Sequence, residues 1–379
     1  MMRELLKLKR KWALTLIPAE IIIILICANY PFIAEYFFGR FVYRILSVVL
    51  GAITRWFPFS VAEMIIYASP IIIISLIGLF VRKIIKGRGM RKSILMRSVL
   101  NVFCFVSIAS FMFVLLCGTN YYRYSFMEYV DYEVTDSDKE DLYGLCLYLA
   151  DKVNEARDNM PEDNDGLSKL SYGSQREFFN KAEDIMSDFS KNYPSMKWST
   201  GSAKPVLASR YMSYTDIVGI FIPFTMEANV NVDTVAYNQP SDVLHELSHL
   251  RGIMREDEAN YVSYLACVSS NEPEFIYSGY MMAYIYASNK LYDEDYDMYY
   301  SVRKKLSDKV IADLVANSKY WRQFDTPVGN TISSVSNKVN NTYLSINGQK
   351  KGTKSYGMVV DLLLAEYKSK IESNNQHKN

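Results

Sequence analysis

Hydrophobic positions are unevenly distributed along the chain: long apolar runs fill its first third, and shorter amphipathic periods follow. A helix needs about 20 mostly apolar residues to cross a bilayer. Three runs meet or approach this length, at residues 12–34, 61–81 and 98–117. A secretory signal peptide is an alternative interpretation of the first run, but no A-x-A cleavage site follows it. The pattern therefore predicts an uncleaved membrane anchor over residues 1–118, with three transmembrane helices.

Two polar features interrupt these apolar runs. Pro18 and Glu20 lie in the first one, and an ionisable group within a span is often functional. We expect Glu20 instead to lie near a helix end or against a partner helix. Residues 41–54 form a further apolar run, but it has only 14 residues and contains Arg44. This favours a helix at the membrane interface over a fourth span.

Lysine and arginine predict the orientation of the anchor. Five of them precede residue 12, and seven lie within residues 82–97, a segment without acidic residues. Positively charged segments that flank membrane helices stay in the cytoplasm. We therefore expect a multi-pass protein of the cell membrane with a cytoplasmic N-terminus. Residues 119–379 then lie outside the cytoplasm.

Residues 119–379 have the periodicity of a mainly helical α+β domain. Helices are predicted at residues 137–158, 174–190, 241–251, 256–270, 274–291, 294–316 and 357–371. A small sheet is predicted within residues 203–237, from short β-branched and aromatic runs at 207–212, 217–224 and 232–237. Polar stretches at 159–167 and 347–355 predict loops.

Charge supports the same division of the chain. The net charge is +1, yet residues 1–124 contain 16 of the 42 Lys and Arg and only 4 of the 41 Asp and Glu. Such asymmetry is typical of a membrane anchor joined to a soluble domain. The basic residues form no patch interleaved with aromatic residues, which argues against a nucleic-acid partner. Cys146 and Cys267, alone among five cysteines, lie in the second part; they could pair but make no disulfide framework.

The strongest chemical signal is the segment His245-Glu246-Leu247-Ser248-His249. Positions i and i+4 share one face of a helix, so both histidines can bind one tetrahedral Zn²⁺ ion. Glu246 lies beside that face, where a carboxylate can act as the general base on a metal-bound water. Pro240-Ser241-Asp242 and Gly252 are typical of the start and end of such a helix. The chain has three histidines, so a chance match to HExxH is improbable.

A catalytic zinc needs a third protein ligand. Glu256 and Glu258 open the next predicted helix and, two residues apart, point to nearly opposite faces. The Glu256 face continues through small residues that permit close packing on the HELSH helix, so Glu256 is preferred and Glu258 is the alternative. Asn260, one turn after Glu256, is a candidate hydrogen-bond partner of a ligand histidine.

Two further features bear on substrate binding. The strand-like residues 219–224 precede the metal helix, and an exposed sheet edge can hold an extended peptide by β-augmentation. A buried core strand is an equally good interpretation. Tyr356 is a weaker candidate, whose hydroxyl could stabilise an oxyanion.

These motifs resemble known families. HELSH followed by an ExxAN helix resembles the gluzincin pattern, which implies Glu256 as ligand and Asn260 as its companion, although the spacing of seven residues from His249 is shorter than in thermolysin-like enzymes. Three spans, GIFIPFTMEANVN, HELSHLRG, REDEAN, YSGY and KSYG resemble a bacterial membrane family known as domain of unknown function 3810. The resemblance implies a zincin-like ectodomain and no particular substrate.

The function expected is that of a membrane-anchored zinc metallopeptidase, hydrolysing peptide bonds with metal-activated water and Glu246 as base. Two alternatives remain open: an extracytoplasmic sensor or binding domain that zinc only stabilises, and a cell-envelope amidase. An open sheet edge would favour peptides, whereas a closed or sugar-sized groove would favour the envelope substrate.

Overall fold

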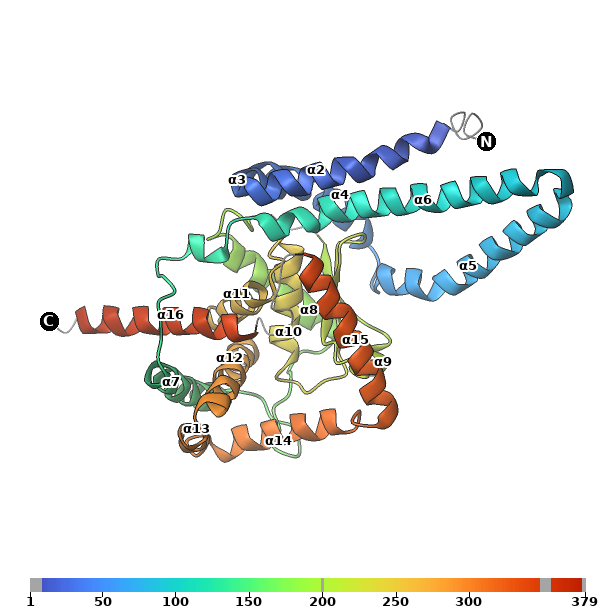
Figure 1. Ribbon diagram of the computed structural model, residues 1–379. Helices are drawn as coiled ribbons and strands as arrows, with labels where there is room; N and C mark the ends of the chain where they lie inside the picture. The colour runs from blue at the N-terminus through green and yellow to red at the C-terminus, as the bar shows by residue number, and fades with distance from the viewer. Residues whose placement is uncertain (1–8, 199–200, 348–355, 377–379) are drawn as a thin grey trace.

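The apolar first third of the chain forms long helices that project from a more compact body (Figure 1). The computed structural model describes residues 9–198, 201–347 and 356–376. The short η1 (Lys9–Thr15) leads into α2 (Leu16–Asn29), which runs alongside α6 (Arg91–Leu116). A turn at η3 (Arg88–Met90) joins α6 to α5 (Val61–Lys86). Ser110 Oγ of α6 donates a hydrogen bond of 2.9 Å to Glu20 Oε1, which is the partner-helix placement expected for Glu20.

A fourth apolar helical run lies between α2 and α5. It consists of α3 (Pro31–Ile33), the π-helical η2 (Ala34–Tyr43) and α4 (Arg44–Thr54). By length and composition this run, Pro31–Thr54, could cross a membrane, as could Lys11–Asn29, Val61–Lys86 and Arg88–Leu116. The first run was predicted to end at residue 34, but the structure breaks it at Tyr30. Proline has no N–H to continue a helix, but it fits the first turn of a new one.

The Pro31–Thr54 run is packed against the body. Thr54 Oγ1 donates to the carbonyl of Thr225 at 2.8 Å. Tyr43, fully buried, donates from its hydroxyl to the carbonyl of Leu250 at 3.0 Å. Glu35 is also buried and accepts from Arg123 Nε at 2.8 Å. The middle and the end of this run are therefore fixed to the same side of the body.

The Tyr43 hydrogen bond gives a test of this packing. Tyr43→Phe removes the hydroxyl but leaves the ring in place, so the free energy of unfolding is expected to fall by about 1 kcal/mol. Denaturant unfolding of the full chain in detergent measures it. Tyr36→Phe is the matched control, since Tyr36 is exposed and its replacement should change stability by less. Equal stability of both variants would contradict the Tyr43 contact.

The body is built from helices that follow the apolar runs. Its main helices are α7 (Lys139–Arg157), α8 (Gln175–Ser190), α10 (Gln239–Leu250), α11 (Glu256–Val268), α12 (Pro273–Glu294), α13 (Tyr296–Arg303), α14 (Asp308–Arg322), α15 (Pro327–Ile346) and α16 (Tyr356–Gln376). Short 3-10 turns η4 (Gly118–Tyr122) and η5 (Phe126–Tyr129) lead from α6 into α7. The expectation of a mainly helical body with a small sheet is confirmed.

The sheet has three short strands in the order β1-β3-β2. They are β1 (Ser202–Pro205), β2 (Gly219–Ile222) and β3 (Glu227–Val230). β1 is parallel to β3, and β2 is antiparallel to it. Side chains alternate along a strand. One face of the sheet therefore carries Ala228, Val230, Gly219 and Phe221, and this face lies against α10. Lys204 and Glu227 share the other face.

Two of the three predicted strands were wrong. Residues 207–212 enter the short helix α9 (Ser209–Ser213), because Leu207 and Ala208 donate their N–H groups to the carboxylate of Glu63. Residues 232–237 form turns, because side chains bond the backbone there: the Asn231 side chain accepts from Asp233 N. The middle run, 217–224, contains β2 as predicted.

Two helical predictions also differ from the structure. Residues 294–316 form two helices, because Asn154 accepts from the N–H of Ser307 and donates to the carbonyl of Lys305 between them. Residues 327–346 were assigned no element, and they form α15. This segment is rich in Ser, Asn and Thr, which are weak helix formers, although Val328, Ile332, Val335 and Val339 follow a helical period.

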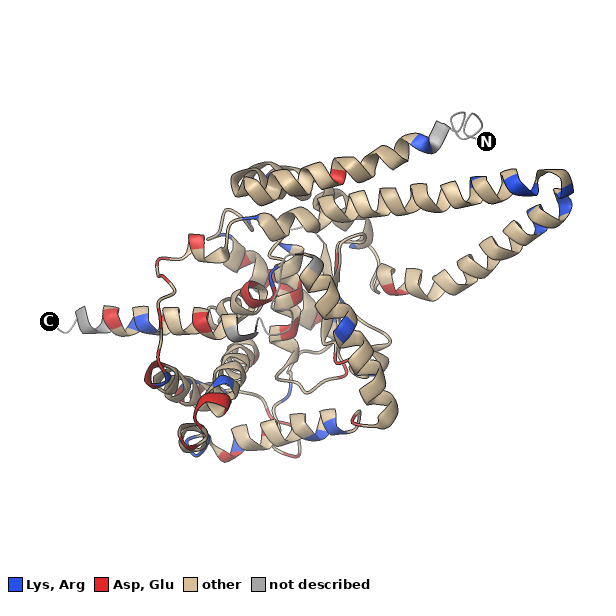
Figure 2. Ribbon diagram, in the orientation of Figure 1, with Lys and Arg blue, Asp and Glu red and all other residues tan. Residues whose placement is uncertain are grey.

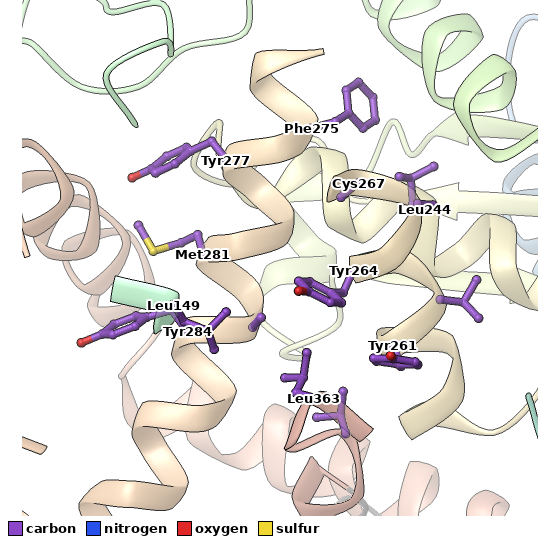
Figure 3. Close-up of a cluster of buried hydrophobic side chains, with 14 of the residues drawn as sticks. Leu149, Leu244, Tyr261, Tyr264, Cys267, Phe275, Tyr277, Met281, Tyr284 and Leu363 are labelled. Atoms are coloured by element: carbon purple, nitrogen blue, oxygen red, sulfur yellow. The ribbon is translucent and has the colours of Figure 1, made fainter. Parts of the chain in front are cut away.

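The core lies between α7, α8, α10, α11, α12 and α16 (Figure 3). Tyrosines fill much of it, including the buried Tyr261, Tyr264, Tyr277 and Tyr284. Cys146 and Cys267 are both buried in this core and are free thiols, so they do not pair. The helix that carries the HELSH segment is thus surrounded by packed side chains, which hold its polar face in a defined position.

Candidate metal centre

The helix α10 carries the HELSH segment in the expected register. It begins at Gln239, slightly earlier than predicted, with Pro240 in its first turn. It ends before Gly252, whose φ of +89° is a backbone conformation that favours glycine. The imidazole rings of His245 and His249 lie on one face with their centroids 4.6 Å apart. Both rings can therefore reach one ion.

The next helix brings a carboxylate to the two histidines. Glu256 opens α11, and its two oxygens lie 3.3 Å from His245 Nε2 and 3.7 Å from His249 Nε2. Ligand atoms from all three residues lie within 4.8 Å of one another. Tetrahedral zinc with bonds of about 2.0–2.1 Å separates its ligands by about 3.4 Å. The donor types and their spacing therefore fit a zinc site with two histidines and one glutamate.

The competing carboxylate is engaged elsewhere. Glu258 Oε1 accepts from Arg255 at 2.7 Å and from Ser125 Oγ at 2.8 Å. Asp257, between the two glutamates, is buried, and this burial raises the pKa of its carboxyl group to about 6. Of the acidic residues in the first turn of α11, the structure brings only Glu256 to the histidines.

Charge interactions in the cluster are strong without a metal. Burial disfavours the charged form of His249, but the adjacent Glu256 carboxylate outweighs it and raises the His249 pKa to about 9. Burial acts in the opposite direction on Glu256, yet the two histidines hold its pKa well below the usual range. The carboxylate thus attracts a positive charge at the point where the three ligand atoms converge, and a divalent cation would meet the same field.

Glu246 is buried next to this cluster. Burial raises the pKa of its carboxyl group, and the nearby histidines partly offset this rise. One oxygen, Oε2, has no hydrogen-bond partner among the described residues. The carboxyl group packs on the backbone of β2, where a Cβ atom on Gly219 would lie 2.4 Å from Glu246 Oε1. Any larger residue at position 219 would have to displace the Glu246 side chain.

The contact with Gly219 leads to a prediction. In Gly219→Ala the new methyl group must displace the Glu246 side chain, so the hydrolytic activity expected from the HExxH motif should fall by about 100-fold, and the metal content should not change. Gly89→Ala is the control, since a Cβ there meets no atom within 4 Å. Turnover and metal content measured on both proteins test it, and full activity of Gly219→Ala would contradict the placement of Glu246.

Hydrogen bonds orient one of the two histidines. His249 Nδ1 lies 2.7 Å from the carbonyl of Ile253, just beyond Gly252. No hydrogen bond joins Asn260 to either histidine among the residues that the structure describes, so the companion role expected for Asn260 falls to a backbone carbonyl. His245 Nδ1 is buried and has no hydrogen-bond partner within the described part of the chain. The spacing of side chains does not reveal a backbone hydrogen-bond partner such as the Ile253 carbonyl. The one sequence signal for it was Gly252, which predicted the turn in which this carbonyl lies.

Two tyrosines reach the neighbourhood of the cluster from other parts of the chain. The Tyr121 hydroxyl donates to that of Tyr343 on α15 at 3.2 Å. Tyr121 is close enough to Glu256 for the carboxylate to contribute to raising its pKa, after the larger effect of burial. Tyr343 could not be found from the sequence, because α15 was not predicted. Tyr356 begins α16, but its side chain lies outside the described residues.

The site combines an HExxH helix with a glutamate from the following helix, a donor set that could hold a metal ion. The family model "Protein of unknown function (DUF3810)" matches residues 38–364, which is most of the chain. The chain therefore belongs to this family, in agreement with the resemblance seen in its motifs. The match begins within η2, so it includes α4, α5 and α6 but not α2 or α3. No curated protein and no solved structure matches the chain.

Proposed function

We propose that the protein is a membrane-anchored zinc metallopeptidase with a zincin-like, gluzincin-type site. One observation carries the proposal: His245, His249 and Glu256 place three ligand atoms within 4.8 Å of one another. The buried Glu246 carboxyl group lies beside them. A purely structural zinc site has four protein ligands, whereas three leave a position for water or substrate. A base next to that position is what hydrolysis requires.

Each group at the site would have a separate role in peptide hydrolysis. Bound zinc would lower the pKa of its water and polarise the scissile carbonyl group. Glu246 takes the proton of the attacking water and passes it to the leaving amine. Burial suits this role, because it raises the Glu246 pKa towards values at which a carboxylate both accepts and releases a proton. The Ile253 carbonyl keeps His249 in one orientation.

The edge strand β2 supports a peptide substrate. Asn231 N donates to the carbonyl of Val218, and the antiparallel register continues through Ile220↔Asn229. Hydrogen-bonded pairs alternate in such a ladder, so the N–H and C=O groups of Gly219 and Phe221 point away from β3. The Phe221 N–H makes a hydrogen bond to the Glu246 carboxyl group. This outer edge of β2 therefore lies directly beside Glu246. An extended peptide bound along it would place a peptide bond near the site.

The apolar helices support a membrane anchor with its N-terminus in the cytoplasm. The basic residues gather at the far end of the α5–α6 hairpin, opposite the body (Figure 2), where the positive-inside rule places the cytoplasm. Pro31–Thr54 is held against the body at Tyr43 and Thr54. This packing supports three spans and a fourth apolar helix outside the bilayer core, with the body outside the cytoplasm.

Metal removal tests the function on the full chain in detergent or nanodiscs. We expect about one zinc ion per chain and cleavage within a peptide library, both lost with a chelator and both restored by Zn²⁺. Full-length protein is needed, because residues before the body contact the metal helix. Cleavage that survives complete removal of the metal would contradict the proposal. Cleavage of peptidoglycan stem peptides alone would instead select the envelope amidase.

A further inference from the structure

Exposed apolar side chains gather where the body meets the start of α5. We call this set the apolar face: Trp56, Phe57, Leu207, Tyr211 and Phe224. Trp56 is 87% exposed, Leu207 69% and Tyr211 76%. Large exposed apolar groups that lie together usually mark an interaction surface. The question is which partner covers them.

Hydrogen bonds fix the apolar face to the beginning of α5. Glu63, in the first turn of α5, accepts from the N–H groups of Leu207 and Ala208 at 2.9 and 2.8 Å. Glu227 of β3, fully buried, accepts from the N–H groups of Val61 and Ala62 at 3.0 and 2.9 Å. These are the free N–H groups at the start of the helix, which attract a carboxylate. The start of α5 and segment 207–211 therefore form one rigid unit.

This unit defines the level of the membrane surface. α5 has a mean hydropathy of 2.5 in its most apolar window, and none of that window is buried in the protein. If α5 crosses a bilayer, its first turn lies at the interface, where Trp, Tyr and Phe side chains are favourable. Trp56 and Phe57 precede this turn, and Leu207 and Tyr211 are attached to it. A lipid surface is therefore the partner whose chemistry fits.

The charge pattern points to the same partner. α15 lies on the side of the body from which α5 projects, whereas α13 and α16 lie on the opposite side (Figure 1). Lys338 is the one charged residue among the 20 of α15, and Val328, Val335 and Val339 are exposed along it. Acidic residues are instead frequent in the helices on the opposite side (Figure 2). Lipid headgroups tolerate such an apolar, weakly basic surface.

The sheet connects this surface to the metal centre. One of its faces packs on α10, the metal helix, and its other face carries Glu227, which holds the start of α5. A single layer of strands thus separates the HELSH helix from the start of the membrane helix. Phe224 follows β2, the strand whose outer edge lies beside Glu246.

We propose that the apolar face rests in the outer leaflet of the bilayer, so that the metal centre opens at the membrane surface. The inference rests on the proposed function and deepens it by naming the substrate class. The substrates are polypeptides held at that surface, such as membrane-tethered proteins or the stretches that flank their spans. A segment leaving the bilayer meets the β2 edge without unfolding of the body.

Spin labels in nanodiscs of phosphatidylcholine and phosphatidylglycerol test the docking without any need for activity. All five native cysteines are buried, so labels are introduced through Leu207→Cys and Tyr211→Cys. Ile74→Cys, in the middle of α5 and exposed, is the lipid control. Tyr296→Cys, exposed on α13, is the water control. Labels at 207 and 211 are expected to collide more with oxygen than with a water-soluble nickel complex, as the label at 74 should. The label at 296 should show the opposite preference.

The outcomes separate the inference from the function on which it rests. Labels at 207 and 211 that behave like the one at 296, with 74 in lipid, overturn the docking and leave the anchor in place. Labels at 207 and 211 that neither reagent reaches mean that a protein covers the face, which also overturns it. A label at 74 in water overturns the membrane anchor itself. Circular dichroism of each variant confirms that it has folded.

A second arm tests the substrate class by using one peptide in two forms, free in solution and linked to a lipid in the same nanodisc. Wild-type protein is expected to cleave the lipid-linked form faster. Tyr211→Glu should lose that preference, because it sets a charge against the bilayer. Equal rates on both forms for the wild type would overturn the substrate class, whereas no cleavage of either form would instead fail the proposed function.

Discussion

Glu246→Gln is expected to lower peptide hydrolysis by about 1,000-fold or more, because the neutral amide cannot accept the proton of the attacking water. Zinc content should be unchanged, since the three ligand atoms belong to His245, His249 and Glu256. The substitution preserves the volume of the side chain, so its packing against Gly219 is kept. Metal analysis and turnover on the same preparation make the comparison direct.

This variant also separates the enzyme from its main alternative. A chain that binds zinc but hydrolyses nothing in a Glu246-dependent way would be a zinc-stabilised sensor or binding domain. Activity retained in Glu246→Gln would show that the hydrolysis belongs to a contaminant or to another site. His245→Ala is the companion variant, which should lose both metal and activity.

Glu256→Gln is expected to have the largest effect on zinc binding among the acidic residues of α11. It replaces a charged ligand oxygen by an amide, and the dissociation constant for zinc should rise by more than the 10–100-fold typical of residues that only support a ligand. Isothermal titration of the metal-free full chain measures it. The geometric reason is that Glu256 oxygens lie 3.3 and 3.7 Å from the two histidine nitrogens.

Glu258→Gln is the matched control, since it makes the same chemical change two residues further on. Glu258 is bound to Arg255 and Ser125, so its replacement should weaken that ion pair and leave zinc affinity nearly unchanged. A loss of zinc in Glu258→Gln together with normal binding in Glu256→Gln would refute the ligand set.

The helix α10 could be predicted from the sequence because its signals are local. The i, i+4 histidines, the proline at its start and the glycine at its end all act within one element, and each has a direct physical meaning. Glu256 was preferred over Glu258 because small residues on its face permit close packing, and the structure places it at the histidines. These inferences needed no knowledge of distant parts of the chain.

Other parts of the site depend on contacts that sequence patterns do not contain. The Ile253 carbonyl took the place expected for Asn260, because a backbone group is available at every residue and leaves no side-chain signature. Segment 207–212 looked like a strand, yet Glu63, about 145 positions earlier, captures its N–H groups. α15 was not predicted, because its many Ser, Asn and Thr residues have weak helix propensity in spite of a clear apolar period.

The hydrogen bond between Tyr43 and Leu250 has a consequence for control of the proposed enzyme. Tyr43 lies in the helical run that precedes the long apolar helix α5, and it contacts the carboxyl end of α10. Proteolytic release of residues 119–379 would leave this contact behind. Shedding is therefore expected to switch off the proposed peptidase, which would confine its activity to the cell that made it.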